Sequence, residues 1–145
     1  MVSEPPSPSH TDLTLDEIDF RADALPEILP SLSDETLHQA DFGIIRLTDE
    51  GTVTFYNQFE AEMSGVDSET ALGMNFFEDL APCTNTDAFA GRFRKNIDIL
   101  EGLDGDSMDL TFQYTFTYRM YPTEVMIRMC RDDSDQNWLL VQPMR

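Results

Sequence analysis

The sequence has few of the side chains that build metal centres and nucleophilic active sites. Its 145 residues include only two cysteines and two histidines, and both histidines, His10 and His38, fall in the first third of the chain. A cysteine hydrolase needs a base beside its thiol, and a metal site of His and Cys needs several ligands close together. Both classes of enzyme are therefore disfavoured. Two cysteines also do not make a disulfide framework.

Positive charge is scarce as well. The chain has nine Lys and Arg residues against 28 Asp and Glu, for a net charge of -19, and Lys95 is the only lysine. A protein that binds nucleic-acid phosphates needs a basic surface, so no nucleic-acid partner is expected, and anionic membranes should repel the chain too. Carboxylates at this density repel one another unless salt screens them. The acidic composition therefore favours a halophilic source.

Long hydrophobic runs are absent from the chain. None approaches the roughly 18 apolar residues that span a bilayer. The first residues, M-V-S-E-P-P-S-P-S-H, have neither the basic nor the apolar region of a secretory signal. We therefore expect a cytoplasmic protein. A hydrophobic content of 41% over this length suits one folded core.

The chain divides into three parts by composition. Residues 1–10 are rich in proline and serine and predict a disordered tail. Residues 11–41 contain a T-x-x-E capping box and interleaved leucines and acids, which predict short helices, the second of them over residues 33–40. We interpret this part as a separable N-terminal helical cap. Residues 42–145 carry the patterns of a folded domain.

Alternation of apolar and polar residues in this domain predicts an antiparallel sheet interrupted by helices. Two strand-like runs flank an acidic turn at Gly51, and apolar and polar residues alternate almost without a break from Met108 to Met120. Two more strands follow. Between the second and third strands, the spacing of Phe89 and Phe93 indicates a helix with one apolar face. The predicted class is α+β, with a five-stranded antiparallel sheet flanked by helices, the arrangement of a PAS domain.

One run carries a more specific signal. It extends from Asn75 to Thr84, reads N-F-F-E-D-L-A-P-C-T, and places Cys83 directly behind a proline. Four residues outside the run fit the same pattern, namely Tyr56, Glu60, Ser64 and Met120. Together they resemble the photoactive yellow protein family, over residues 42–141. The resemblance implies a blue-light photoreceptor, not an enzyme, that holds p-coumaric acid (4-hydroxycinnamic acid) as a thioester on Cys83.

The resemblance also implies a role for each residue around the chromophore. Tyr56 and a protonated Glu60 would donate hydrogen bonds to its phenolate, and Ser64 would support the Tyr56 hydroxyl. Val66 stands where the family commonly has an arginine, so a cationic lid over the ring is absent. The positions that match the chromophore walls are Ile45, Phe76, Leu80, Thr84, Phe116 and Tyr118. Met120 matches a residue that helps the isomerised chromophore to return.

The implied mechanism follows from charge. Light would isomerise the chromophore from trans to cis, the phenolate would take the proton of Glu60, and the buried carboxylate left behind would drive release of the N-terminal cap. A monomer that signals to an unidentified downstream protein is expected. The alternative is a chromophore-free PAS-type ligand-binding or protein-interaction module, in which Cys83 is an ordinary buried thiol. A flavin-binding light sensor is disfavoured because an N-C-R-F-L-type motif is missing.

Overall fold

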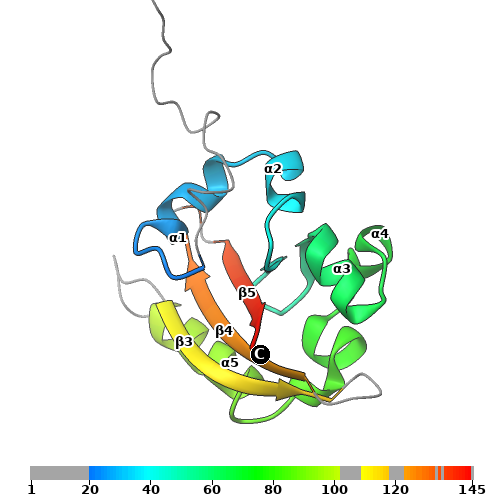
Figure 1. Ribbon diagram of the computed structural model, residues 1–145. Coiled ribbons are helices and arrows are strands. Elements are labelled where there is room, and N and C mark those ends of the chain that lie inside the picture. The colour runs from blue at the N-terminus through cyan, green and yellow to red at the C-terminus, as the bar shows by residue number, and fades with distance from the viewer. Residues whose placement is uncertain (1–19, 102–108, 118–122, 133, 135, 145) are drawn as a thin grey trace, which may run out of the picture.

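A five-stranded antiparallel sheet forms the centre of the protein (Figure 1). The computed structural model describes residues 20–101, 109–117, 123–132, 134 and 136–144. The strands are β1 (Gly43–Leu47), β2 (Val53–Tyr56), β3 (Asp109–Phe116), β4 (Thr123–Arg131) and β5 (Asn137–Pro143). Their order across the sheet is β2-β1-β5-β4-β3, and every pairing is antiparallel. The predicted fold class is confirmed.

Alternation along the strands divides the buried side chains between two faces of the sheet. In β1, Ile45 and Leu47 belong to one hydrophobic cluster, whereas Ile44 belongs to the other. Successive side chains of a strand point to opposite faces, so each cluster lies on its own face. We call the side with Ile45 the inner face and the side with Ile44 the outer face.

The segment between β2 and β3 covers the inner face. Its elements are α3 (Gln58–Ser64), α4 (Ser68–Ala71), the π-helical turn η4 (Phe76–Leu80), the 3-10 turn η5 (Pro82–Thr84) and α5 (Ala90–Glu101). Gly65, with a φ of 81°, ends α3 in the left-handed conformation typical of a helix C-terminus. Phe93 of α5 and Phe89, which directly precedes the helix, are both buried in the inner cluster, as their spacing predicted.

Three short helices lie against the outer face. They are α1 (Leu25–Ile28), the 3-10 turn η3 (Leu29–Ser31) and α2 (Asp34–His38). The Ser33 hydroxyl accepts a hydrogen bond from the Thr36 amide and so caps α2, as expected for a helix over residues 33–40. Leucines of these helices pack with Trp138 of β5 in the outer cluster. The predicted tail, residues 1–10, and the predicted capping box lie outside the described residues.

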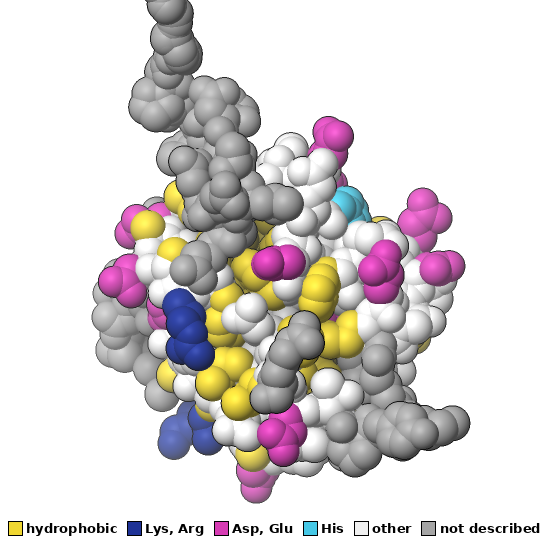
Figure 2. All heavy atoms as spheres, viewed as in Figure 1, with side chains coloured by type: hydrophobic (Ala, Val, Ile, Leu, Met, Phe, Trp, Pro, Cys, Tyr) yellow, Lys and Arg dark blue, Asp and Glu magenta, His cyan; other side chains and the backbone are white. Residues whose placement is uncertain are grey.

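Acidic side chains are spread over much of the face shown in Figure 2, while hydrophobic ones gather near its middle. Carboxylates on this face are exposed to solvent, where salt can screen them. In the part of the chain that the structure describes, no helix is long and apolar enough to cross a bilayer.

Candidate functional site

The end of β2 and the end of α3 hold a partly buried pair of hydroxyl groups. The Tyr56 hydroxyl donates a hydrogen bond to Ser64 Oγ over 2.8 Å, and the Val66 amide donates to the same oxygen over 3.2 Å. Tyr56 is 2% exposed and lies opposite Ile45 in the β1–β2 pairing. The pair predicted for Tyr56 and Ser64 is therefore present.

Glu60 is a carboxyl group inside the protein. It lies on α3 and is 0% exposed, although most of the chain's many acids would be expected on the surface. Its amide donates to Oδ1 of Asn57, the N-cap residue of α3, over 3.0 Å. Its carboxyl packs against β1 at Gly43. Glu60 thus lies in the interior and not on the solvated face of α3.

Cys83 lies in η5 and is tied to the end of β3. Its thiol is free and half-buried, and Sγ accepts a hydrogen bond from the Thr117 amide over 3.4 Å. The Cys83 carbonyl accepts from the Tyr114 hydroxyl over 2.7 Å. Because a tyrosine hydroxyl has one proton, Thr86 must donate to the Tyr114 oxygen across their 2.9 Å contact. These contacts hold the cysteine loop against the sheet.

The second cysteine lies in a different environment. Cys130 is buried in the outer cluster, on the opposite side of the sheet from Tyr56. Burial, with the nearby charge of Asp109, raises the pKa of its thiol to about 12, which keeps it protonated and poorly nucleophilic. Cys83 is therefore the cysteine that can meet a reactive ligand.

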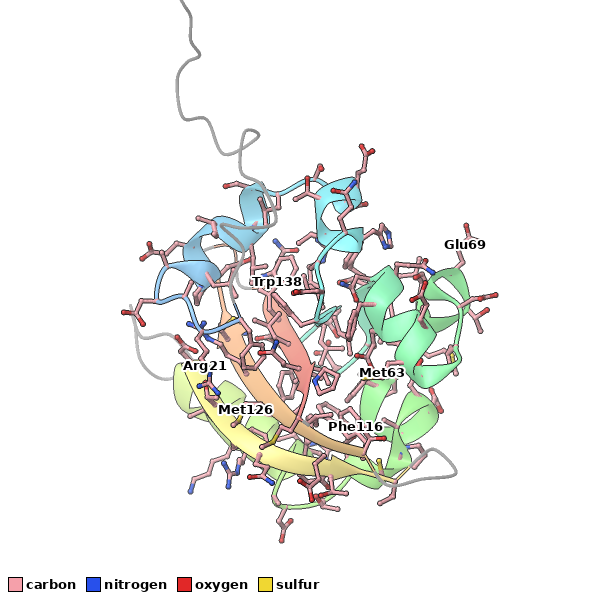
Figure 3. All side chains as sticks on the ribbon, in the orientation of Figure 1. Arg21, Met63, Glu69, Phe116, Met126 and Trp138 are labelled. Carbon is pink, nitrogen blue, oxygen red and sulfur yellow. The ribbon has the colours of Figure 1, made fainter. Side chains whose placement is uncertain are left out.

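The predicted wall residues gather around the inner cluster. Those that belong to it are Ile45, Phe76, Leu80 and Phe116. The predicted donor Tyr56 belongs to it too, and Val66 and Cys83 pack against it as half-buried side chains. Thr84 is buried too, and its hydroxyl donates to the Ala81 carbonyl over 2.6 Å. Figure 3 labels Phe116 at the end of β3 and Met63 on α3, which also packs on this cluster. Tyr118 and Met120 lie outside the described residues.

Sequence reasoning missed two residues that support the site through hydrogen bonds. Asn57 caps the helix that carries Glu60, and the N-x-x-E pattern could have indicated it. Tyr114 was expected only as a core residue of an alternating strand. Its hydroxyl contact with Cys83 joins residues 31 positions apart, and no local pattern predicts such a pairing.

A separate, open hollow lies beside α3 and α4 and contains none of the predicted site residues. Its lining is mostly polar and consists of His38, Gln58, Ala61, Glu62, Gly65, Asp67, Ser68 and Glu69. Because the predicted site residues lie elsewhere, we place the candidate site at the inner cluster.

Comparison with known proteins agrees with this fold and this site. The PAS fold family matches residues 33–142, which defines the class as a PAS domain. The photoactive yellow protein of Rhodothalassium salexigens is 35% identical over 129 residues, covering 88% of this chain and 98% of the relative. That of Halochromatium salexigens is 36% identical over 126 residues, covering 86% and 96%.

A solved structure supports the same assignment. The photoactive yellow protein domain of the sensor histidine kinase Ppr from Rhodospirillum centenum superposes with a TM-score of 0.71 at 31% identity, covering 79% of this chain and 96% of that domain. The chain belongs to the photoactive yellow protein family. It is thus a photoreceptor-type sensory domain and not an enzyme.

Proposed function

We propose that this chain is a blue-light photoreceptor that holds p-coumaric acid as a thioester on Cys83. The observation that carries the proposal is that one inner cluster brings together a half-buried free thiol and a buried tyrosine hydroxyl paired with a serine. A fully buried carboxyl on the adjoining helix completes a donor set that fits a phenol. When bound, the group would supply blue absorption, trans-cis isomerisation and a phenolate that accepts a proton.

Cys83 would hold the acyl end of the chromophore. Its Sγ would lose a proton to solvent and attack the carbonyl carbon of an activated coumaroyl donor, forming the S–C bond as the bond to the leaving group breaks. The hydrogen bond from Tyr114 to the Cys83 carbonyl would fix the loop during this step. The apolar cluster would then protect the thioester from water.

Tyr56 and Glu60 would hold the phenolate end. For Tyr56 to donate there, the Ser64 hydroxyl would turn and donate to Tyr56 in place of accepting from it, as a hydroxyl group can. Burial disfavours the charged form of a carboxyl, so Glu60 would carry a proton in the dark. Val66 would shield the ring without adding charge.

Illumination would move the Glu60 proton to the phenolate and leave a buried carboxylate. A charge buried in this way costs several kcal/mol, a large part of a small domain's stability. Asn57 contacts both Glu60 and the carbonyl of Leu37 in α2, so a shift of α3 would strain the N-terminal helices. Release of the predicted cap, residues 11–41, from a monomer would present a changed surface to a downstream protein.

The proposal is tested by loading the purified protein with an activated p-coumaric acid. We expect a yellow product whose intact mass has gained one coumaroyl group. The Cys83→Ala variant should fold, as judged by circular dichroism, yet remain colourless. The Cys130→Ala variant is the matched control and should load normally. A folded wild-type protein that gains no mass would favour the chromophore-free PAS module instead, and a coloured Cys83→Ala variant would place the attachment elsewhere.

A further inference from the structure

Gly43 leaves an empty side-chain position on the inner face of β1. Its neighbour Ile44 points to the outer cluster, and Ile45 points to the inner cluster, so alternation assigns position 43 to the inner face. Among the glycines that the structure describes, those with a positive φ are Gly51, Gly65 and Gly73, and Gly43 is not one of them. Its backbone conformation would therefore accept any residue, and the reason for a glycine must be spatial.

The carboxyl of Glu60 fills this position. A Cβ atom at residue 43 would overlap Glu60 Oε1, and would lie 3.2 Å from its Cδ and 3.3 Å from its Cβ. The overlap is therefore with the carboxyl tip of Glu60, while the contacts with its Cδ and Cβ are tight. A methyl group and the present Glu60 carboxyl cannot occupy this space together.

The backbones of β1 and α3 cannot easily move apart at this point, because the buried side-chain amide of Asn57 is hydrogen-bonded to both. Its Oδ1 accepts from the amides of Ile44, over 2.9 Å, and of Glu60, over 3.0 Å. Its Nδ2 donates to the Phe42 carbonyl over 3.0 Å. The residues on either side of Gly43 and the backbone of Glu60 are therefore held by one side chain. A larger residue at position 43 would have to be accommodated by the Glu60 carboxyl.

We propose that Gly43 is a positioning residue for Glu60, and that its missing side chain allows the carboxyl to lie against β1 beneath the inner cluster. The inference rests on the proposed function, in which this carboxyl donates to the bound phenolate. In Gly43→Ala the carboxyl would be displaced. The phenolate would then lose a strong donor and keep more negative charge, which shifts its absorption to longer wavelength.

The test compares Gly43→Ala with Gly91→Ala after both have been loaded with p-coumaric acid. Gly91 is the matched control, because a Cβ there meets nothing closer than 3.5 Å. We expect Gly43→Ala to shift the absorption band to longer wavelength by about as much as Glu60→Gln, and Gly91→Ala to leave it in place. In a Glu60→Gln background, Gly43→Ala should add little. A wild-type spectrum for Gly43→Ala, or a full additive shift in the double variant, would overturn the proposal.

A second measurement separates this inference from the proposed function. In the chromophore-free protein, infrared difference spectroscopy can follow the carboxyl of Glu60, identified as the band that Glu60→Gln removes. Gly43→Ala should move that band even if no chromophore binds to the wild type, and an unmoved band counts against the inference. If Gly43→Ala fails to fold, Gly43→Ala with Glu60→Ala should restore folding, because it removes the overlapping atoms. A double variant that stays unfolded would place the conflict elsewhere and overturn the proposal.

Discussion

The two faces of the sheet are covered in different ways. The inner cover is part of the chain between β2 and β3 and is rich in aromatic rings around Phe89. The outer cover, residues 20–40, is rich in leucine. Figure 3 labels Trp138 on β5 and Met126 on β4, two residues of the sheet that meet this outer cover.

Polar contacts hold the outer cover at a few points. Arg128 of β4, which pairs with Asp109, donates from Nη1 to the carbonyls of Phe20 and Ala22 over 2.9 and 2.7 Å. Asn57 Nδ2 donates to the Leu37 carbonyl over 2.9 Å. Contacts to backbone carbonyls hold a segment in place without depending on its side chains. The inner cover lies between two strands of the sheet in sequence, whereas the outer cover precedes them all, so we expect the outer cover to be the element that moves.

The largest difference between the faces should appear when a buried phenylalanine is removed from each. Phe89 is 0% exposed and its ring lies 4.9 to 6.1 Å from five other aromatic rings. We expect Phe89→Ala to lower the free energy of unfolding by about 3–5 kcal/mol, as measured by urea denaturation.

Phe42 is the matched residue on the outer face, 1% exposed and in edge contact with Phe20 at 5.7 Å. Because its cover can settle into the space left behind, we expect Phe42→Ala to cost about 1–2 kcal/mol less than Phe89→Ala. Equal costs would mean that the outer cover is as rigid as the inner one, and the comparison would fail.

The strand pattern could be predicted from the sequence because a sheet buried on alternate residues imposes a period of two. β3 repeats it in full, with its polar residues exposed and Leu110, Phe112 and Tyr114 half-buried. The burial of Glu60 could not be read from its own neighbours, since a lone acid in so acidic a chain is usually exposed. It was expected only through its spacing from Tyr56 and Cys83.

Contacts between distant residues were beyond sequence reasoning. Arg128 reaches a carbonyl 108 positions away at Phe20, and the Gly43–Glu60 contact depends on how α3 lies over β1. Periodicity specifies which face a side chain takes and says nothing of its partner across the fold. The inner site was therefore predicted as a set of residues, and its supporting contacts were not.

We expect an intermediate effect on stability when Asn57, which is hydrogen-bonded to both covers, is replaced. Asn57→Ala would remove the cap of α3 and leave the Leu37 and Phe42 carbonyls without their donor. A lost cap costs about 1 kcal/mol and a buried group left unsatisfied about 1–3 kcal/mol, so we expect a loss of about 2–4 kcal/mol in urea denaturation.

The same variant should also change the outer cover more than the inner one. Limited proteolysis should cut residues 20–40 of Asn57→Ala before it cuts the sheet. Asn85→Ala is the control, because Asn85 is exposed and its side-chain oxygen accepts a 3.3 Å contact from exposed Arg94; it should change stability by no more than about 0.5 kcal/mol. Simultaneous cleavage in both regions would show that Asn57 supports the whole domain and not the junction.

The smallest expected effect is a pH dependence that arises from the outer face. The pKa of Cys130 is raised from 9.0 to about 12, first by burial and then by the charge of Asp109, while Arg128 opposes the shift. The folded protein therefore keeps a proton that the unfolded chain loses above about pH 9. The stability from this group is complete below pH 9 and is lost as the pH rises through the interval up to 12.

Over one pH unit inside that interval, the loss in the free energy of unfolding approaches about 1.4 kcal/mol, and from pH 9 to 10 we expect a loss of about 1 kcal/mol. Urea denaturation of the wild type and of Cys130→Ala at both pH values isolates the contribution of this thiol, because every other titrating group is common to the two proteins.

Removal of residues 1–40 should uncover Cys130, so that a maleimide labels it at neutral pH while it stays protected in the full chain. Equal labelling with and without residues 1–40 would show that the outer cover does not shield this thiol. Equal pH slopes in wild type and Cys130→Ala would show the same. Either result would remove the basis for the contrast between the two faces.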